Sequence, residues 1–125
     1  MNIINIISVS VQSQYIAEQS NPDHEKYVFS YTITIANKGQ NPAKLLNRHW
    51  IIKDGEGGVE EVMGAGVVGE QPYLESGQSY TYTSGAILKT PVGTMEGQYE
   101  MTTDDGQHFF AKIAPFTLSI PRVLH

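Results

Sequence analysis

An alternation with a period of two residues is the pattern that most constrains how this chain can fold. It is clearest in the segment YVFSYTITIA, whose apolar positions are Tyr27, Phe29, Tyr31, Ile33 and Ile35. Alternate side chains of a β-strand point to one face, so this segment predicts a strand with an apolar face, rich in residue types that strands favour. No window of a dozen residues keeps the i, i+3, i+4, i+7 apolar spacing of an amphipathic helix.

Similar runs predict further strands at 7–11, 45–53, 59–63, 78–83, 97–103, 107–113 and 116–120. Turn-forming sequences separate them: NKGQNP follows the 27–36 strand, whereas DGEGG (54–58) and DDG (104–106) have the residues of hairpin turns. Only PDHEKY suggests a helical turn. Short strands with regular turns predict an all-β fold, an antiparallel β-sandwich of the immunoglobulin/fibronectin type III-like kind.

Trp50 is the only tryptophan and lies in the middle of the strand-like sequence RHWIIKD. A tryptophan on a central strand of such a sandwich is expected in the core. Neighbouring residues on a strand point to opposite faces, so we expect His49 and Ile51 to point away from the core if Trp50 points into it.

The length of 125 residues suits one domain, spanning 1–125, that buries roughly two-thirds of its unfolded surface without a metal or disulfide. The absence of cysteine excludes disulfides, thiol nucleophiles and cysteine-ligated metals. The N-terminal sequence MNIINIISVSVQSQY lacks the basic region of a signal peptide, and no run approaches the roughly 18 apolar residues of a membrane span. We expect a cytoplasmic protein without a membrane partner.

The charge balance argues against a nucleic-acid partner. Thirteen acidic residues against eight basic ones give a formal net charge of −5. Nucleic-acid binding rests on basic side chains that displace phosphate counterions, and long-range repulsion would oppose the approach of a polyanion here.

The sequence GAGVVGEQP (64–72) has the G-x-G-x-x-G spacing of dinucleotide-binding folds. In those folds a helix follows the glycines and presents free N–H groups to the pyrophosphate. Here Pro72 would interrupt such a helix, and no Gly-Lys-Ser/Thr makes the segment a P-loop. A Rossmann site is therefore not expected.

Three roles for this loop stay open. Glycines permit tight bends, so the loop can be architectural. It can contact another protein, or its backbone N–H groups can form a nest for a phosphate. The candidate phosphate-binding or ligand-binding loop comprises Gly64, Ala65, Gly66, Val67, Val68 and Gly69. Arg48 and His49 are the candidate supporting residues.

Chemistry of other kinds finds little support in the sequence. His24, His49, His108 and His125 lack zinc-binding spacing, and no EF-hand loop or nucleophile elbow is present. We therefore predict no catalytic residues, no metal ligands, no cofactor and a non-enzymatic protein.

Tyr80 and Tyr82 share one strand face, near Tyr73 and Tyr99 in our interpretation. Exposed, these tyrosines would form a protein-contact surface; buried, they would be core.

Taken together, the sequences RHWII, VEEVMGAGVVGEQPYL, YTSGAILKTPVGTMEGQYEM and IAPFTL resemble the bacterial ApaG family, also called CorD. The resemblance covers nearly the whole chain in the same order. Ala65 and Ser76 stand where many members have proline, whereas Gly64, Gly66 and Gly69 match the family motif.

The resemblance implies a fibronectin type III-like sandwich without an established catalytic activity. The family is similar to a domain of eukaryotic F-box proteins that is thought to mediate protein contacts. Its gene commonly neighbours one for diadenosine tetraphosphate hydrolysis, the family has been linked to cobalt and magnesium resistance, and its glycine motif has been proposed to bind pyrophosphate. We therefore expect a module for protein–protein interaction whose partner is unknown. The alternatives are binding of phosphate, pyrophosphate or a dinucleoside polyphosphate, and an indirect role in cobalt/magnesium homeostasis.

Overall fold

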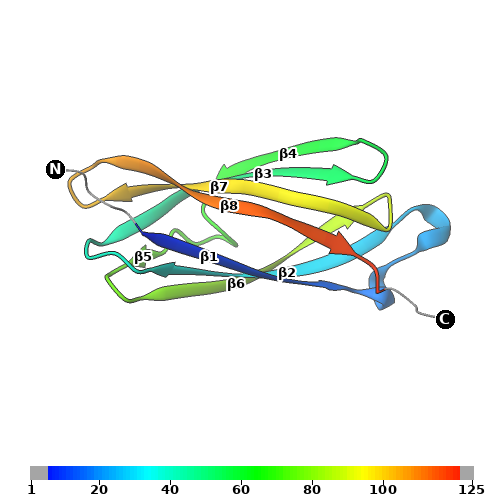
Figure 1. The fold of residues 1–125 in the computed structure, drawn as a ribbon, viewed down its shortest axis with the longest axis horizontal. Coiled ribbons are helices and arrows are strands. Elements are labelled where there is room, and N and C mark those ends of the chain that lie inside the picture. The colour runs from blue at the N-terminus through cyan, green and yellow to red at the C-terminus, as the bar shows by residue number, and fades with distance from the viewer. Residues whose placement is uncertain (1–5, 122–125) are drawn as a thin grey trace.

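Two antiparallel β-sheets face each other in the computed structural model, which describes residues 6–121 (Figure 1). The smaller sheet has the order β1-β2-β6, formed by Ile7–Tyr15, Tyr27–Asn37 and Ser79–Leu88. The larger has the order β4-β3-β7-β8, formed by Val59–Ala65, Ala43–Asp54, Val92–Thr103 and His108–Ser119, and the short β5 (Tyr73–Leu74) pairs with β3. The predicted all-β antiparallel sandwich is thus confirmed.

The two hairpin turns and one of the two short helices also follow the prediction, whereas the other short helix was not predicted. The DGEGG sequence joins β3 to β4 and the DDG sequence joins β7 to β8. Two single-turn 3-10 helices, η1 (Ala17–Gln19) and η2 (Pro22–His24), lie between β1 and β2, and the second falls in the PDHEKY sequence. No helix of the described residues is long and apolar enough to cross a membrane.

The predicted strands at 107–113 and 116–120 were wrong as separate elements, because they form the single strand β8. Its register against β7 shifts where Met95 pairs with Phe116 and Gly97 pairs with Ile113, which leaves one extra residue on β8. Pro115 lies in this irregularity, on a strand at the edge of its sheet. Bulges and edge strands tolerate proline, so the strand continues through it.

Other strand limits also differ. β7 begins at Val92 rather than at 97, β1 extends to Tyr15, and β6 extends to Leu88. The two-residue strand β5 was not predicted at all, because a period of two cannot be recognised in two residues.

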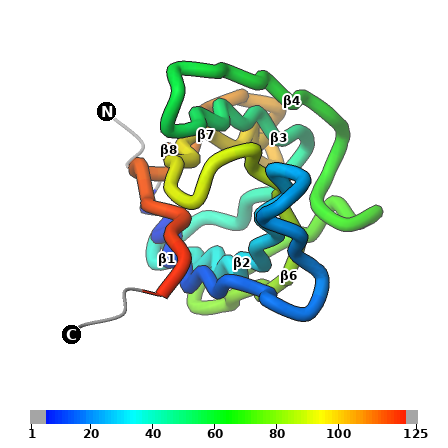
Figure 2. Tube along the Cα trace, turned by 90° about the vertical axis from the view of Figure 1, so that its right-hand side faces the viewer, coloured from blue at the N-terminus to red at the C-terminus, as the bar shows by residue number. Residues whose placement is uncertain are grey.

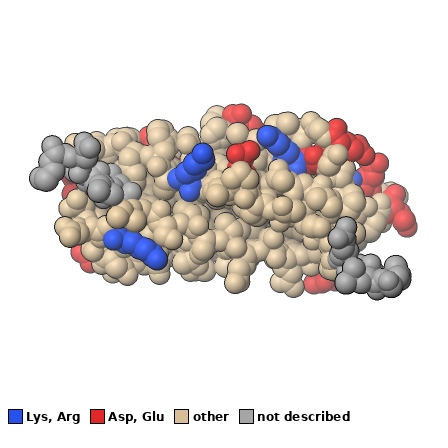
Figure 3. Space-filling view, viewed as in Figure 1, with Lys and Arg blue, Asp and Glu red and all other residues tan. Residues whose placement is uncertain are grey.

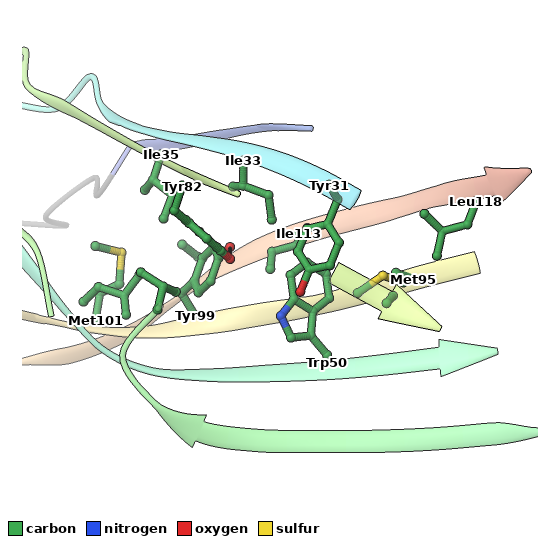
Figure 4. Close-up of a cluster of buried hydrophobic side chains, with 14 of the residues drawn as sticks. Tyr31, Ile33, Ile35, Trp50, Tyr82, Met95, Tyr99, Met101, Ile113 and Leu118 are labelled. Atoms are coloured by element: carbon green, nitrogen blue, oxygen red, sulfur yellow. Dashed lines mark hydrogen bonds between the residues drawn. The ribbon is translucent and has the colours of Figure 1, made fainter. Parts of the chain in front are cut away.

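Aromatic packing between the sheets occupies the centre of the core. Trp50 is 2% exposed, and Tyr31 from the opposite sheet packs edge-on against it with ring centroids 5.4 Å apart. Phe116 and Tyr99 pack edge-on at 6.0 Å and 6.4 Å. Figure 4 shows Trp50 and Tyr31 facing each other across the sandwich. The predicted burial of Trp50 is confirmed, and His49 lies on the outer face, as the alternation requires.

A hydrogen bond between the hydroxyls of Tyr82 and Tyr99 joins the two sheets. The two side chains point toward one another from β6 and β7 (Figure 4). Burial raises the pKa of both hydroxyls above the ordinary value, so both are neutral donors and acceptors at physiological pH. Tyr82 and Tyr99 are therefore core residues and cannot form the exposed tyrosine surface that the sequence left open.

The two lateral sides of the sandwich differ. On one side β1 lies against β8, where the Ser13 hydroxyl donates to the carbonyl oxygen of Thr117 at 3.3 Å. On the other side the edge strands β4 and β6 belong to different sheets and do not pair (Figure 2). The glycine loop follows β4 and lies on this open side.

We predict that Tyr99→Phe destabilises the protein by about 1–3 kcal/mol, because it leaves the buried Tyr82 hydroxyl without its partner. The double variant Tyr82→Phe/Tyr99→Phe should cost less than the sum of the two single changes, since it removes both polar groups. Urea unfolding measures all three free energies. Additive losses would show that the hydroxyl pair contributes nothing as a pair.

Candidate functional site

The glycine loop begins within β4, where Gly64 and Ala65 pair with Arg48 and Asn47 of β3. The backbone N–H of Gly66 donates to the carbonyl oxygen of Leu46 at 2.8 Å. Leu46 is the residue left over where the β3–β7 register shifts between Leu45 and Asn47. The bulge in β3 thus supplies the acceptor that fixes the first bend of the loop.

A tight turn completes the loop. Val67 and Glu70 exchange backbone hydrogen bonds of 2.8 Å and 3.0 Å around Val68 and Gly69. Both central residues have positive φ, 48° and 81°, which is the signature of a type I′ turn. The turn places Val67 fully inside the core and leaves the side chain of Val68 63% exposed.

Arg48 holds this loop from the inner side of β3. Its Nη1 donates to the carbonyl oxygens of Ala65 at 3.0 Å and of Gly66 at 3.1 Å. The guanidinium also covers Gly64, where an added Cβ would lie 2.8 Å from Nη1. Gly66 has a φ of 64°, and a Cβ there would overlap the carbonyl oxygen of Glu70. The structure therefore requires glycine at the first two positions of the motif for two different reasons, the guanidinium beside Gly64 and the backbone conformation of Gly66.

The anion-binding chemistry of a Rossmann loop is not reproduced by this geometry. A strand precedes the motif, but the next element after it is the strand β5 rather than a helix. The N–H groups of Gly66, Val67 and Glu70 donate to carbonyl oxygens of the protein. A nest needs successive N–H groups free to converge on the anion, so these three are not available to one.

The side chains of the two candidate supporting residues point to opposite faces of β3. Arg48 points toward the glycine loop, whereas His49 points from the outer face of the same sheet. His49 Nε2 lies 3.1 Å from Glu61 Oε1, an ion pair when the imidazole is protonated, although the two groups lack hydrogen-bond alignment. Arg48 therefore bonds to the loop directly, whereas His49 lies on the outer face, on a surface that it shares with Arg48, Gly64 and Ala65.

That surface is a groove of about 510 Å³, here called the outer groove. It is lined by Asn47, Arg48, His49, Met63, Gly64, Ala65, Gln98, Glu100 and Phe110. Met63 is 70% exposed and Phe110 is 60% exposed, so two large apolar side chains flank polar groups of the sheet. Sequence reasoning missed both residues, because an apolar residue in a strand gives no sign of which face is covered.

Hydrogen bonds order the polar part of the outer groove. Asn47 Nδ2 donates to Glu100 Oε1 at 2.7 Å, and His108 Nδ1 lies 2.9 Å from Glu100 Oε2. The hydrogen bond from Asn47, and after it the one with His108, hold the pKa of Glu100 below its ordinary value. Glu100 therefore remains a carboxylate at physiological pH.

A second groove, here called the lateral groove, lies on the open side between β4 and β6 and has a volume of about 630 Å³. Its walls include Tyr31, Trp50, Val62, Ser84 and Ala86. Its two charged lining residues are Arg48 and Glu60. Arg48 is on β3, and Glu60 is on β4 opposite Ile52, which is four residues further along β3. The positive and negative charges therefore lie toward opposite ends of this groove.

Metal binding has no evident site in the part of the chain that the structure describes. Within residues 6–121, no three His, Asp or Glu side chains converge as a metal ion would need.

An antiparallel sandwich with a glycine loop fixed by an arginine defines a class of β-module rather than a Rossmann fold. Residues 17–103 match the model of the ApaG domain. The ApaG proteins of Pseudomonas fluorescens (strain Pf0-1) and Ectopseudomonas mendocina (strain ymp) are 56% and 57% identical to this chain, each over 95% of it and 94% of the relative. The chain belongs to the ApaG family.

Solved structures agree with this assignment. A crystal structure of a Bordetella pertussis protein is 49% identical in sequence, with a TM-score of 0.92, over 95% of this chain and 97% of that one. A further X-ray structure has 54% identity and a TM-score of 0.89, over 95% of this chain and 90% of that one.

We predict that Gly66→Ala destabilises the protein more than Gly69→Ala. Both residues have positive φ, which costs a residue with a Cβ about 1–2 kcal/mol, but only at Gly66 would the Cβ also overlap another backbone group. Urea unfolding of both variants separates the steric effect from the conformational one. Equal losses would mean that the loop moves away from Glu70 at little cost.

Proposed function

We propose that this protein is a non-enzymatic module that binds another protein through the outer groove. The observation that carries the proposal is the exposure of Met63 and Phe110 on opposite sides of one groove. Exposed apolar side chains grouped around a hollow and bordered by polar groups are typical of protein contact sites. Methionine and aromatic residues are also enriched in such interfaces.

The polar residues of the groove support the same proposal. Asn47 and Glu100 line the groove, and Glu100 is hydrogen-bonded to Asn47 and to His108, so these side chains are already ordered before a partner arrives. An ordered surface loses less conformational entropy on binding. On the face shown in Figure 3, acidic side chains gather toward one end, and basic side chains are isolated among wide uncharged areas. The net charge of −5 also makes a polyanion a poor partner for this chain.

Photo-cross-linking tests the proposal. A benzophenone amino acid replaces Met63 or Phe110 in the full-length protein, which is then irradiated in cells of its own organism. We expect both positions to give an adduct of one defined mass. The adduct formed from position 63 should disappear when Phe110 is changed to Asp, because a buried charge at the contact opposes binding.

Val92 provides the matched control, since it is an exposed apolar residue, 46% exposed, that does not line the outer groove. A probe at Val92 should give no such adduct. The same adduct from Val92, or none from positions 63 and 110, would contradict the proposal.

Anion binding is the second candidate function, favoured by the position of Arg48. Its Nη1 is used by the loop, and its charge has no carboxylate within 4.0 Å among the described residues. A phosphate could accept hydrogen bonds from the rest of the guanidinium, since arginine suits phosphate oxygens. The ligand classes are pyrophosphate and a dinucleoside polyphosphate.

An NMR titration of the labelled protein with pyrophosphate and diadenosine tetraphosphate, with and without magnesium, tests this candidate. If the loop binds phosphate, saturable amide shifts should concentrate at 64–69 and disappear in Arg48→Gln. Lys53→Gln serves as the control, because Lys53 already pairs with Glu96 and lies away from the loop. Unchanged spectra at high ligand concentration would exclude the candidate.

A further inference from the structure

The outer edge of β6 offers a row of unpaired backbone groups. β6 pairs with β2 on one side, and no described strand pairs with its other side. The N–H of Asn37 donates to the carbonyl of Gln78, and the β2–β6 register then runs without a break. Because hydrogen-bonding directions alternate along an antiparallel pair, the even-numbered residues of β6 bond to β2. The N–H and C=O groups of Ser79, Thr81, Thr83, Gly85 and Ile87 therefore point outward.

This edge lacks the usual protection against strand addition. The ten residues of β6, SYTYTSGAIL, include neither a charged residue nor a proline. The neighbouring edge strand β4, by contrast, carries Glu60 and Glu61. Proteins commonly place charges or prolines on exposed edges to prevent pairing with other chains, so β6 is the edge that remains open to a new strand.

The lateral groove lies directly beside this edge. It shares Ser84, Gly85 and Ala86 with β6, and its opposite wall is β4. A strand added to β6 would point every second side chain toward the interior side of the sheet, and hence into this groove. Arg48 would meet such a side chain close to Thr83 and Ser84, with which it lines one hollow.

We propose that an extended segment of a partner protein adds to β6 as a further antiparallel strand and places a carboxylate against Arg48. The backbone groups of β6 supply the main-chain hydrogen bonds of this complex, and the lateral groove selects its side chains. Arg48 requires an acidic residue beside Thr83 and Ser84.

Charge complementarity separates this occupant from a second copy of the chain. The β6 strand of a second copy could pair with the same edge, but it has no charged residue to offer Arg48. Two molecules with a net charge of −5 also repel each other. An acidic segment from another protein can form main-chain hydrogen bonds with the open edge of β6 and place a carboxylate beside Arg48.

This inference extends the proposed protein-binding function to a second surface, which shares Arg48 with the outer groove. Met63 and Phe110 do not line the lateral groove. Binding at β6 should therefore persist in Met63→Asp and Phe110→Asp, so the two proposals can fail separately.

A phage-displayed library of random peptides, each as long as β6, is the probe. Selection on the full-length protein should enrich peptides that share Asp or Glu at one position. In calorimetry with an enriched synthetic peptide, replacing that acid by its amide should weaken binding about ten- to a hundredfold, as expected for a charged hydrogen bond. The Arg48→Gln variant should bind the acidic peptide and its amide variant equally, because the guanidinium that would pair with the carboxylate is absent.

Two further measurements test the strand itself. The peptide should slow amide hydrogen exchange at Thr81 and Thr83, whose N–H groups point outward, in the unmodified protein. Thr83→Pro removes one of these donors without removing a bond to β2, so it should abolish binding of both peptides. Tryptophan fluorescence of Trp50 checks that this variant is folded.

Several results would overturn the proposal. They are a selection without enriched peptides, binding that ignores Arg48→Gln, and unchanged exchange at Thr81 and Thr83 in the peptide complex. Slowed exchange that appears with rising protein concentration and no peptide would show that a second copy occupies the edge instead.

Discussion

The burial of Trp50 between the two sheets is the constraint on which the rest of this structure depends. Tyr31, Tyr99 and Phe116 surround the indole edge-on, from strands of both sheets. Because side chains alternate along β3, this packing directs Arg48 toward the interior side and His49 toward the outer face. One buried aromatic residue thus turns two adjacent polar side chains to opposite faces of the sheet, Arg48 toward the glycine loop and the lateral groove, and His49 toward the outer groove.

Arg48 connects the core to the glycine loop. It lies two residues from Trp50 on the same strand face, and its guanidinium covers Gly64 while bonding to the carbonyls of Ala65 and Gly66. The loop then folds back over the sandwich and buries Val67. The glycine motif forms a bend built around this arginine, and the same arginine is the one basic side chain among the described residues that line the lateral groove.

The strand pattern could be predicted from the sequence, because alternation and turn residues are local properties. The face of β2, the burial of Trp50 and the two hairpins followed from them. The passage of β8 through Pro115 could not be predicted, since it depends on a bulge opposite β7. The partners of Tyr82 and Tyr99 could not either, because residues distant in sequence meet only when the sheets pack.

The sequence by itself determined the fold class, the membership of the ApaG family, and the absence of the helix that a dinucleotide site would need. Only the tertiary structure decided where the functional surfaces lie. Met63 and Phe110 line the same groove from its two sides because they come from β4 and β8, the two edge strands of one sheet. β6 becomes an open edge because the strand order, which local residue patterns do not encode, leaves it without a second neighbour among the described strands.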